Sequence, residues 1–139
     1  MPPRESGLIV PGDAKSLTTT DLNGDGRPDF VVGVNDDNLA VFEQTGASAS
    51  ALASIRLKGK KGNLSAVGSR VRVTLDDGST QTAEVAAGDG YLSQSGAVLT
   101  FGLGSGRKVT EVEVRWPDGS RSHTTDPDTS SLLVIPWTR

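Results

Sequence analysis

The sequence predicts an all-β protein, and three features of the 139-residue chain carry this prediction. Short segments alternate apolar with polar residues, as strands do when one face of a sheet is buried, and the clearest are residues 70–75 (RVRVTL) and 109–116 (VTEVEVRW). Glycine-bearing turns separate such segments at near-regular spacing. No long stretch has the 3.6-residue period of an amphipathic helix. We therefore expect short antiparallel strands, with a small β-sandwich or barrel-like domain in the C-terminal part.

The N-terminal third contains two expected strands joined by an acidic loop. Residues 16–20 (SLTTT) and 29–34 (DFVVGV) are rich in β-branched side chains, which favour strands. Residues 21–29 read DLNGDGRPD and carry oxygen-bearing side chains around a glycine. Four side chains supply those oxygens: Asp21, Asn23, Asp25 and Asp29.

The acidic loop has the donor atoms that a calcium ion requires, namely six to eight oxygens at about 2.3–2.6 Å. The alternation of Asp21, Asn23 and Asp25 lets their side chains converge as the backbone curls, and Gly26 permits the tight turn. The backbone carbonyl of Arg27 is a natural further ligand. The sequence therefore predicts a Ca²⁺ site in this loop.

Two other interpretations of the loop compete with calcium binding. In the helix-flanked calcium loop the twelfth position is a bidentate glutamate, whereas Val32 stands there in this chain, so that version is disfavoured. An ordinary hairpin turn rich in Asn, Asp and Gly is the simpler alternative. Three aspartates crowded into nine residues repel one another unless a cation lies between them, which favours the metal.

Residues 18–46 (TTTDLNGDGRPDFVVGVNDDNLAVFEQTG) resemble the FG-GAP or VCBS repeat, the calcium-loop blade of integrin-like β-propellers. The resemblance implies that Asp21, Asn23, Asp25, the Arg27 carbonyl and Asp29 are the ligands. The sequence holds one copy of the loop, whereas repeat units of this kind need several neighbours to bury their faces. We expect a partial propeller, the last blade of a longer protein, that packs on further blades or on another copy.

A second β-rich part follows a short connection. Residues 46–54 (GASASALAS) are small and polar, as connections are. Beyond them we expect strands at residues 55–58, 70–75, 81–85, 97–101, 109–116 and 132–137. Asp77-Gly78 and Asp118-Gly119 predict hairpin turns. The expected organisation is a blade over residues 1–46, a linker over 47–54 and a β domain over 55–139.

The second part strongly resembles the ASPIC/UnbV domain. Four motifs carry this resemblance in order, at residues 63–73 (NLSAVGSRVRV), 84–95 (EVAAGDGYLSQS), 99–104 (LTFGLG) and 112–122 (VEVRWPDGSRS). That domain typically follows VCBS repeats in bacterial surface or secreted proteins and in the cartilage acidic protein of animals. The two resemblances support each other, and they imply a secreted or cell-envelope protein; the domain's activity is not established.

Composition excludes several classes of function. The net charge of −3, from 17 acidic and 14 basic residues, gives no electrostatic footprint for nucleic acid. The chain has no cysteine, so disulfides are excluded and metal is the available cross-link. No apolar run of 18 residues indicates a membrane span, and the N-terminus has no apolar segment typical of a signal peptide.

No catalytic motif emerges from the sequence. The single histidine, His123, follows a hairpin turn and is interpreted as a solvated strand residue. GxSxG, P-loop and HExxH patterns are absent. A pair of catalytic carboxylates among Asp76, Asp77, Glu84 and Asp89 stays open, although turn formation explains these residues more simply. We therefore expect a protein that is not an enzyme.

Two surface features are candidates for binding. Residues 56–62 (RLKGKKG) hold four cations, including Arg56, Lys58 and Lys60, and suit an anionic glycan or, more simply, a lysine-bearing edge strand. Tyr91, the only tyrosine, suits sugar recognition if it is exposed, or is a buried ring with a bonded hydroxyl. Trp116 is expected to anchor the core and Trp137 to cover the base of the sheet.

The sequence thus favours a calcium-binding, non-enzymatic extracellular or cell-envelope module for adhesion, scaffolding or ligand presentation. The alternative is a carbohydrate-binding or enzyme-associated accessory domain that uses Tyr91 with Arg56, Lys58 and Lys60.

Overall fold

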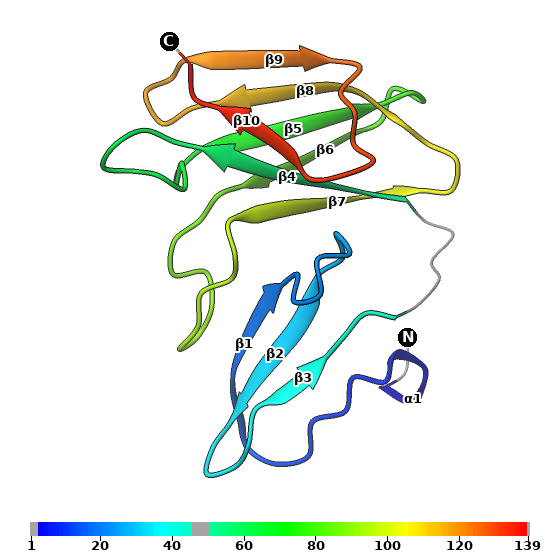
Figure 1. Ribbon diagram of the computed structural model, residues 1–139, viewed down its shortest axis with the longest axis vertical. Coiled ribbons are helices and arrows are strands. Elements are labelled where there is room, and N and C mark those ends of the chain that lie inside the picture. Colours follow the sequence, from blue (N-terminus) through cyan, green and yellow to red (C-terminus); the bar gives the residue numbers. More distant parts are fainter. Residues whose placement is uncertain (1–2, 46–50, 139) are drawn as a thin grey trace. The chain divides into compact units, whose positions relative to one another are not determined.

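The computed structural model describes residues 3–45 and 51–138, and apart from one short helical segment its regular elements are strands (Figure 1). The described chain divides into two units. The first comprises the residues up to Thr45 together with Gly88–Gly96, and the second comprises the remainder from residue 46 onward. The expectation of an all-β protein is confirmed.

The first unit is built on a three-stranded antiparallel sheet in the order β1-β2-β3. Its elements are α1 (Pro3–Ser6), β1 (Ala14–Thr20), β2 (Asp29–Val34) and β3 (Ala40–Phe42). The pairings Leu17↔Val32 and Val32↔Ala40 place apolar side chains on one face, because paired residues of neighbouring strands point the same way. The two strands predicted around the acidic loop therefore form a hairpin, and β3 extends it.

The segment Gly88–Gly96 runs along the outer edge of β1. The Thr18 hydroxyl donates a hydrogen bond to the Gln94 carbonyl at 2.8 Å, and the Gly96 amide donates to the Thr19 carbonyl at 3.1 Å. The Thr19 amide donates to the Ser95 hydroxyl at 3.3 Å. These bonds occupy polar backbone groups that an uncovered edge strand would leave unpaired.

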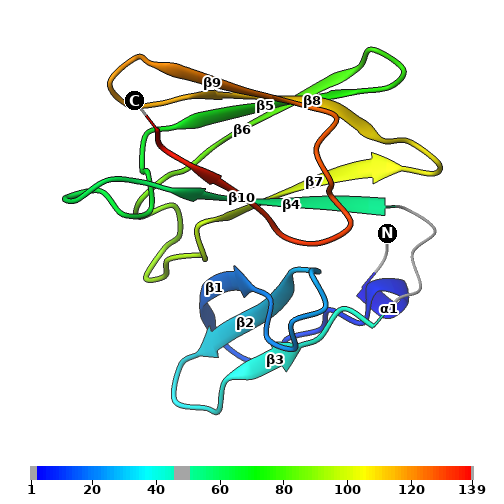
Figure 2. The ribbon, with the colours of Figure 1, turned by 45° about the horizontal axis from the view of Figure 1, so that its top comes forward.

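The second unit is a sandwich of two sheets (Figure 2). Three strands lie in the order β10-β4-β7 and four in the order β6-β5-β8-β9. Their bounds are β4 (Ala51–Lys58), β5 (Arg70–Leu75), β6 (Thr80–Glu84), β7 (Val98–Gly104), β8 (Val109–Arg115), β9 (Arg121–Thr125) and β10 (Leu133–Pro136). All pairings are antiparallel except that of β10 with β4. No ladder between described strands joins the two sheets, so the sandwich applies and the barrel-like alternative does not.

Alternation in the sequence generates the core of the sandwich. On β5, Val71, Val73 and Leu75 are buried while Arg70 and Arg72 are exposed, as the RVRVTL pattern predicts. Both sheets contribute to one apolar cluster, and the three-stranded sheet supplies Ile55 and Phe101 to it. Burial of this apolar cluster is the main contribution to the stability of the second unit.

Two expectations differ from the structure around β4. Residues 51–54 belong to the strand rather than to the connection, because Ala53 and Ser54 are buried in the sheet and pair with β7. Residues 46–50 of the expected linker lie outside the described residues. The expected edge strand is also wrong at Arg56 and Lys58, since β4 lies between β10 and β7.

Candidate functional site

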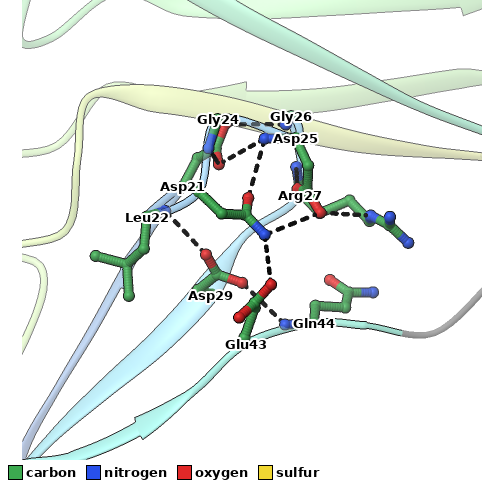
Figure 3. Close-up of polar contacts among 10 residues, drawn as sticks. Asp21, Leu22, Gly24, Asp25, Gly26, Arg27, Asp29, Glu43 and Gln44 are labelled. Carbon is green, nitrogen blue, oxygen red and sulfur yellow. Dashed lines mark hydrogen bonds and ion pairs between the residues drawn. The ribbon is translucent and has the colours of Figure 1, made fainter.

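The acidic loop between β1 and β2 folds around the carboxylate of Asp21 (Figure 3). Asp21 Oδ1 accepts hydrogen bonds from the amides of Gly24 at 2.7 Å and Asp25 at 3.1 Å, and Oδ2 accepts one from Gly26 at 2.9 Å. Gly24 and Gly26 have φ angles of 78° and 82°, in the left-handed region that glycine enters without strain. The first aspartate thus organises the loop by gathering its backbone amides.

Asp29 begins β2 and is fully buried at the base of the loop. Its Oδ2 accepts a hydrogen bond from the Leu22 amide at 2.8 Å, and its Oδ1 accepts one from the Gln44 amide at 2.9 Å. A buried carboxylate must be compensated in this way, because loss of hydration is costly. Asp29 therefore fastens the start of the loop to the chain that follows β3.

Asn23 and Asp25 lie on the exposed side of the loop. The side-chain amide of Asn23 donates through Nδ2 to Asp25 Oδ2 at 3.3 Å and to Glu43 Oε1 at 2.7 Å. Arg27 donates its backbone amide to Asp25 Oδ1 at 2.8 Å and its Nε to Oδ2 at 3.1 Å. The backbone hydrogen bond from Arg27 is the largest contribution that lowers the pKa of Asp25, and the Asn23 bond and the Arg27 charge assist it. Asp25 is therefore ionised at neutral pH.

The donor chemistry of this loop suits a hard cation, because carboxylate and amide oxygens predominate. The five predicted ligand residues, Asp21, Asn23, Asp25, Arg27 and Asp29, all belong to the loop or its base. Within residues 3–45 and 51–138, however, no three acidic or histidine side chains lie close enough together to hold a metal. Asp21 and Asp29 direct their oxygens at backbone amides instead.

Glu43 is a member of the site that was not predicted from the sequence. It follows β3, and the pairing of Phe30 with Phe42 places residue 43 beside Asp29. Its carboxylate reaches Asn23, twenty residues earlier in the chain. The feature of the sequence that could have identified Glu43 was the short strand after residues 35–39. Because β3 pairs with β2 in antiparallel orientation, the end of β3 lies beside the loop.

Tyr91 lies in the first unit and is 74% exposed, so the alternative of a buried ring is wrong. It borders a hollow of about 580 Å³ that Leu8, Val10, Leu17 and Val32 also line.

The basic candidates Arg56, Lys58 and Lys60 lie in the second unit, apart from the unit that holds Tyr91. Arg56 and Lys58 are exposed on β4. Lys60 Nζ lies 3.6 Å from Asp118 Oδ2 and 4.1 Å from the centre of the Trp137 ring. Lys60 is thus engaged with a carboxylate and an aromatic face of its own unit.

Side chains of the second unit contact both tryptophans and the histidine. Trp116 is buried, and its Nε1 donates to the Ser122 hydroxyl at 2.8 Å. Trp137 stacks on it with ring centres 5.2 Å apart and planes 9° from parallel. Trp116 is therefore the predicted core anchor. His123 lies on β9 with its side chain 53% exposed and its Nδ1 3.2 Å from Glu111 Oε1.

Comparison with protein families agrees with both resemblances. Residues 59–138 match the family described as ASPIC and UnbV, and residues 15–52 match the FG-GAP repeat. Because the first match covers more than half of the chain, the protein belongs to the ASPIC and UnbV family. A comparison with curated proteins gave no significant match.

The FG-GAP match places the acidic loop inside a repeat that is typical of extracellular proteins and that often binds calcium. No helix in the described part of the chain is long and apolar enough to cross a membrane.

Proposed function

We propose that the protein is a non-enzymatic, calcium-binding module of the extracellular space or cell envelope that serves adhesion, scaffolding or ligand presentation. The observation that carries the proposal is the loop of residues 21–29, which lies inside the FG-GAP match. It connects the antiparallel strands β1 and β2 and holds three aspartates and an asparagine. Neither matched family is a known catalytic family, which supports a binding role.

In this proposal the loop residues have different tasks. Asp21, Asn23 and Asp25 are all exposed and supply oxygens to the ion. Asp29 holds the base through the Leu22 and Gln44 amides. Calcium neutralises the crowded carboxylates, and binding requires Asn23 and Asp25 to exchange their present partners for the ion. The carbonyl of Arg27 is the further ligand that the family resemblance supplies.

Two exposed apolar side chains of the first unit offer a surface for a partner. Leu39 lies directly before β3 and is 66% exposed, and Val41 lies on β3 and is 56% exposed. Exposed apolar side chains on a small sheet are typical of a surface that another sheet covers. We propose that further blades, or another copy of the chain, cover it.

A carbohydrate-binding or accessory role is the second candidate. The exposure of Tyr91 beside an apolar hollow favours it, because an exposed aromatic ring can stack on a sugar. Arg56, Lys58 and Lys60 are the basic residues that this role would use.

Asp25→Ala tests the calcium proposal, with Asp13→Ala as the matched control. Asp13 is an exposed aspartate of the same unit whose carboxylate pairs with Lys15 at 2.7 Å, outside the loop. We expect calcium to raise the melting temperature of the wild type and of Asp13→Ala but not of Asp25→Ala. Asp25→Asn retains an acceptor for the Arg27 amide, and we expect it to weaken calcium affinity by about tenfold. An equal calcium response in Asp25→Ala and the wild type would overturn the proposal.

A further inference from the structure

The outer face of the four-stranded sheet carries arginines that folding alone does not explain. Arg70 on β5 pairs with Arg115 on β8, and Arg115 pairs with Arg121 on β9, so three arginines lie abreast on adjacent strands. Like charges directly opposite one another destabilise a sheet. The sequence nevertheless places them side by side, with Arg72 in the next row.

Glu113 organises two of these arginines. It is 7% exposed, in the centre of the face, where Arg72 Nη2 donates to its Oε2 at 2.5 Å and Arg121 donates to its Oε1. Both carboxylate oxygens are therefore already occupied by guanidinium groups. Each guanidinium carries five N–H donors in a planar fork, so one bond to Glu113 fixes its position and leaves other donors for a ligand.

The remaining two arginines are less compensated. Arg70 lies 3.7 Å from Glu84, and both side chains are more than half exposed, so this pair is weak. No ion pair involves Arg115 in the part of the chain that the structure describes. Arg115 therefore contributes a charge that no neighbouring carboxylate cancels.

These side chains surround a hollow of about 270 Å³, which we call the arginine hollow. Its lining consists of Arg70, Arg72, Thr82, Glu113, Arg115 and Arg121. Four positive charges and one negative charge leave an excess of three positive charges in this lining. The volume falls below the roughly 300–1,000 Å³ of pockets for drug-sized ligands, so a single small group suits it.

We propose that the arginine hollow binds a tetrahedral dianion, the sulfate or phosphate ester group of a larger ligand. Guanidinium forks match the oxygens of such groups in pairs, and Thr82, which also lines the hollow, has a hydroxyl that can act as a neutral donor. A bound dianion reduces the repulsion among Arg70, Arg115 and Arg121. Glu113 acts as a positioning residue that holds Arg72 and Arg121 in place.

The proposal is tested on the full chain with sodium sulfate and sodium phosphate, and sodium chloride at equal ionic strength is the reference. We expect sulfate or phosphate to cause saturable NMR shifts of the arginine side-chain Nε–Hε signals of the hollow, and chloride to cause none. Arg115→Gln should weaken this binding at least about tenfold, because it removes a charge-assisted contact, without lowering the melting temperature. Arg115→Lys keeps the charge but not the fork and should weaken binding less than Arg115→Gln.

Arg56→Gln is the matched control, because it removes one exposed arginine from the other sheet of the same unit. We expect it to change the affinity by less than about twofold, as a screened distant charge does. Equal losses in Arg56→Gln and Arg115→Gln would mean that net charge alone attracts the anions and would overturn the site. The absence of saturable shifts with both oxyanions would also overturn it.

A second titration identifies the source of the ester. A sulfated glycosaminoglycan hexasaccharide and its desulfated counterpart, and mannose 6-phosphate and mannose, are compared by calorimetry. Preference for the sulfated sugar over its desulfated form assigns a sulfate ester, and preference for mannose 6-phosphate over mannose assigns a phosphate ester. If neither ester binds more tightly than its uncharged counterpart, the proposal of an ester-bearing ligand is wrong.

Discussion

At the scale of single residues, Glu113 combines burial with ionisation. Burial raises its pKa, but the hydrogen bond from Arg121 and the charges of Arg72, Arg121 and His123 outweigh that effect, so the pKa lies below its ordinary value of 4.5. A carboxylate whose pKa is lowered by folding contributes stability above its unfolded pKa. It loses that contribution as the pH falls through the folded pKa.

We predict that Glu113→Gln lowers the free energy of unfolding at pH 7 by about 1–2 kcal/mol, because Arg72 and Arg121 lose the negative charge and one of the two acceptor oxygens that they share; water partly screens both arginines, which limits the loss. The difference from the wild type should shrink as the pH falls below 4.5. Urea unfolding at several pH values measures it. Glu84→Gln, on the same face but in an exposed pair, should cost less than about 0.5 kcal/mol; equal costs for the two variants would contradict this account.

Residue identities in the acidic loop were predictable from the sequence, but their individual contacts were not. The spacing of Asp21, Asn23 and Asp25 identified the loop. It gave Asp29 the same role as the others, whereas the structure buries Asp29 and bonds it to the Leu22 and Gln44 amides. Gln44 and Glu43 join the site through the pairing of β2 with β3, and local sequence does not encode such a pairing.

At the scale of elements, the two predicted Asp-Gly turns have the same construction. Each continues with serine, and the aspartate accepts a hydrogen bond from the serine amide at 2.9 Å in both turns. The serine hydroxyl and amide bonds lower the pKa of Asp77 and of Asp118. These turns were predictable because their determinants lie within three consecutive residues. The central position of β4 was not, because it depends on the distant strands β7 and β10.

The loop after β4 gives a prediction at the same scale. A Cβ atom on Gly59 would lie 1.9 Å from the Asn63 carbonyl oxygen and 2.9 Å from the Ala66 amide nitrogen. Backbone atoms cannot yield easily, so Gly59→Ala should lower the free energy of unfolding by more than about 2 kcal/mol. Tryptophan fluorescence during urea unfolding measures this.

Gly102 provides the control within the same sandwich. It lies on β7, and no atom would come within 4 Å of a Cβ added there. Gly102→Ala should therefore change the stability by less than about 0.5 kcal/mol. A Gly59→Ala variant as stable as Gly102→Ala would show that the loop after β4 is not packed as described.

At the scale of the whole molecule, the all-β class and most strands followed from alternation and turn residues. Burial of Val71 and Val73 beside exposed Arg70 and Arg72 is the plainest case. The assignment of residues 88–96 to the first unit was not predictable, because it rests on bonds such as that from Gly96 to Thr19, which join residues far apart in sequence. Periodicity identifies strands, but contacts between distant segments decide which unit they join.

Calcium binding to the acidic loop should stabilise the first unit locally and by a measurable amount. If the free calcium concentration exceeds the dissociation constant a hundredfold, binding stabilises the folded state by about 2.7 kcal/mol. The acidic loop belongs to the first unit, whereas the apolar cluster of the sandwich belongs to the second. Calcium should therefore affect the hairpin of β1 and β2 more than the sandwich.

The most direct test is a calorimetric calcium titration of the chelator-treated protein, followed by thermal melting with and without the ion. We predict saturable binding of about one ion per chain and a higher melting temperature in calcium. No saturable binding at millimolar calcium would contradict the proposed metal site, and the loop would then be a turn held by its own hydrogen bonds, chiefly those that Asp21 and Asp29 accept from backbone amides.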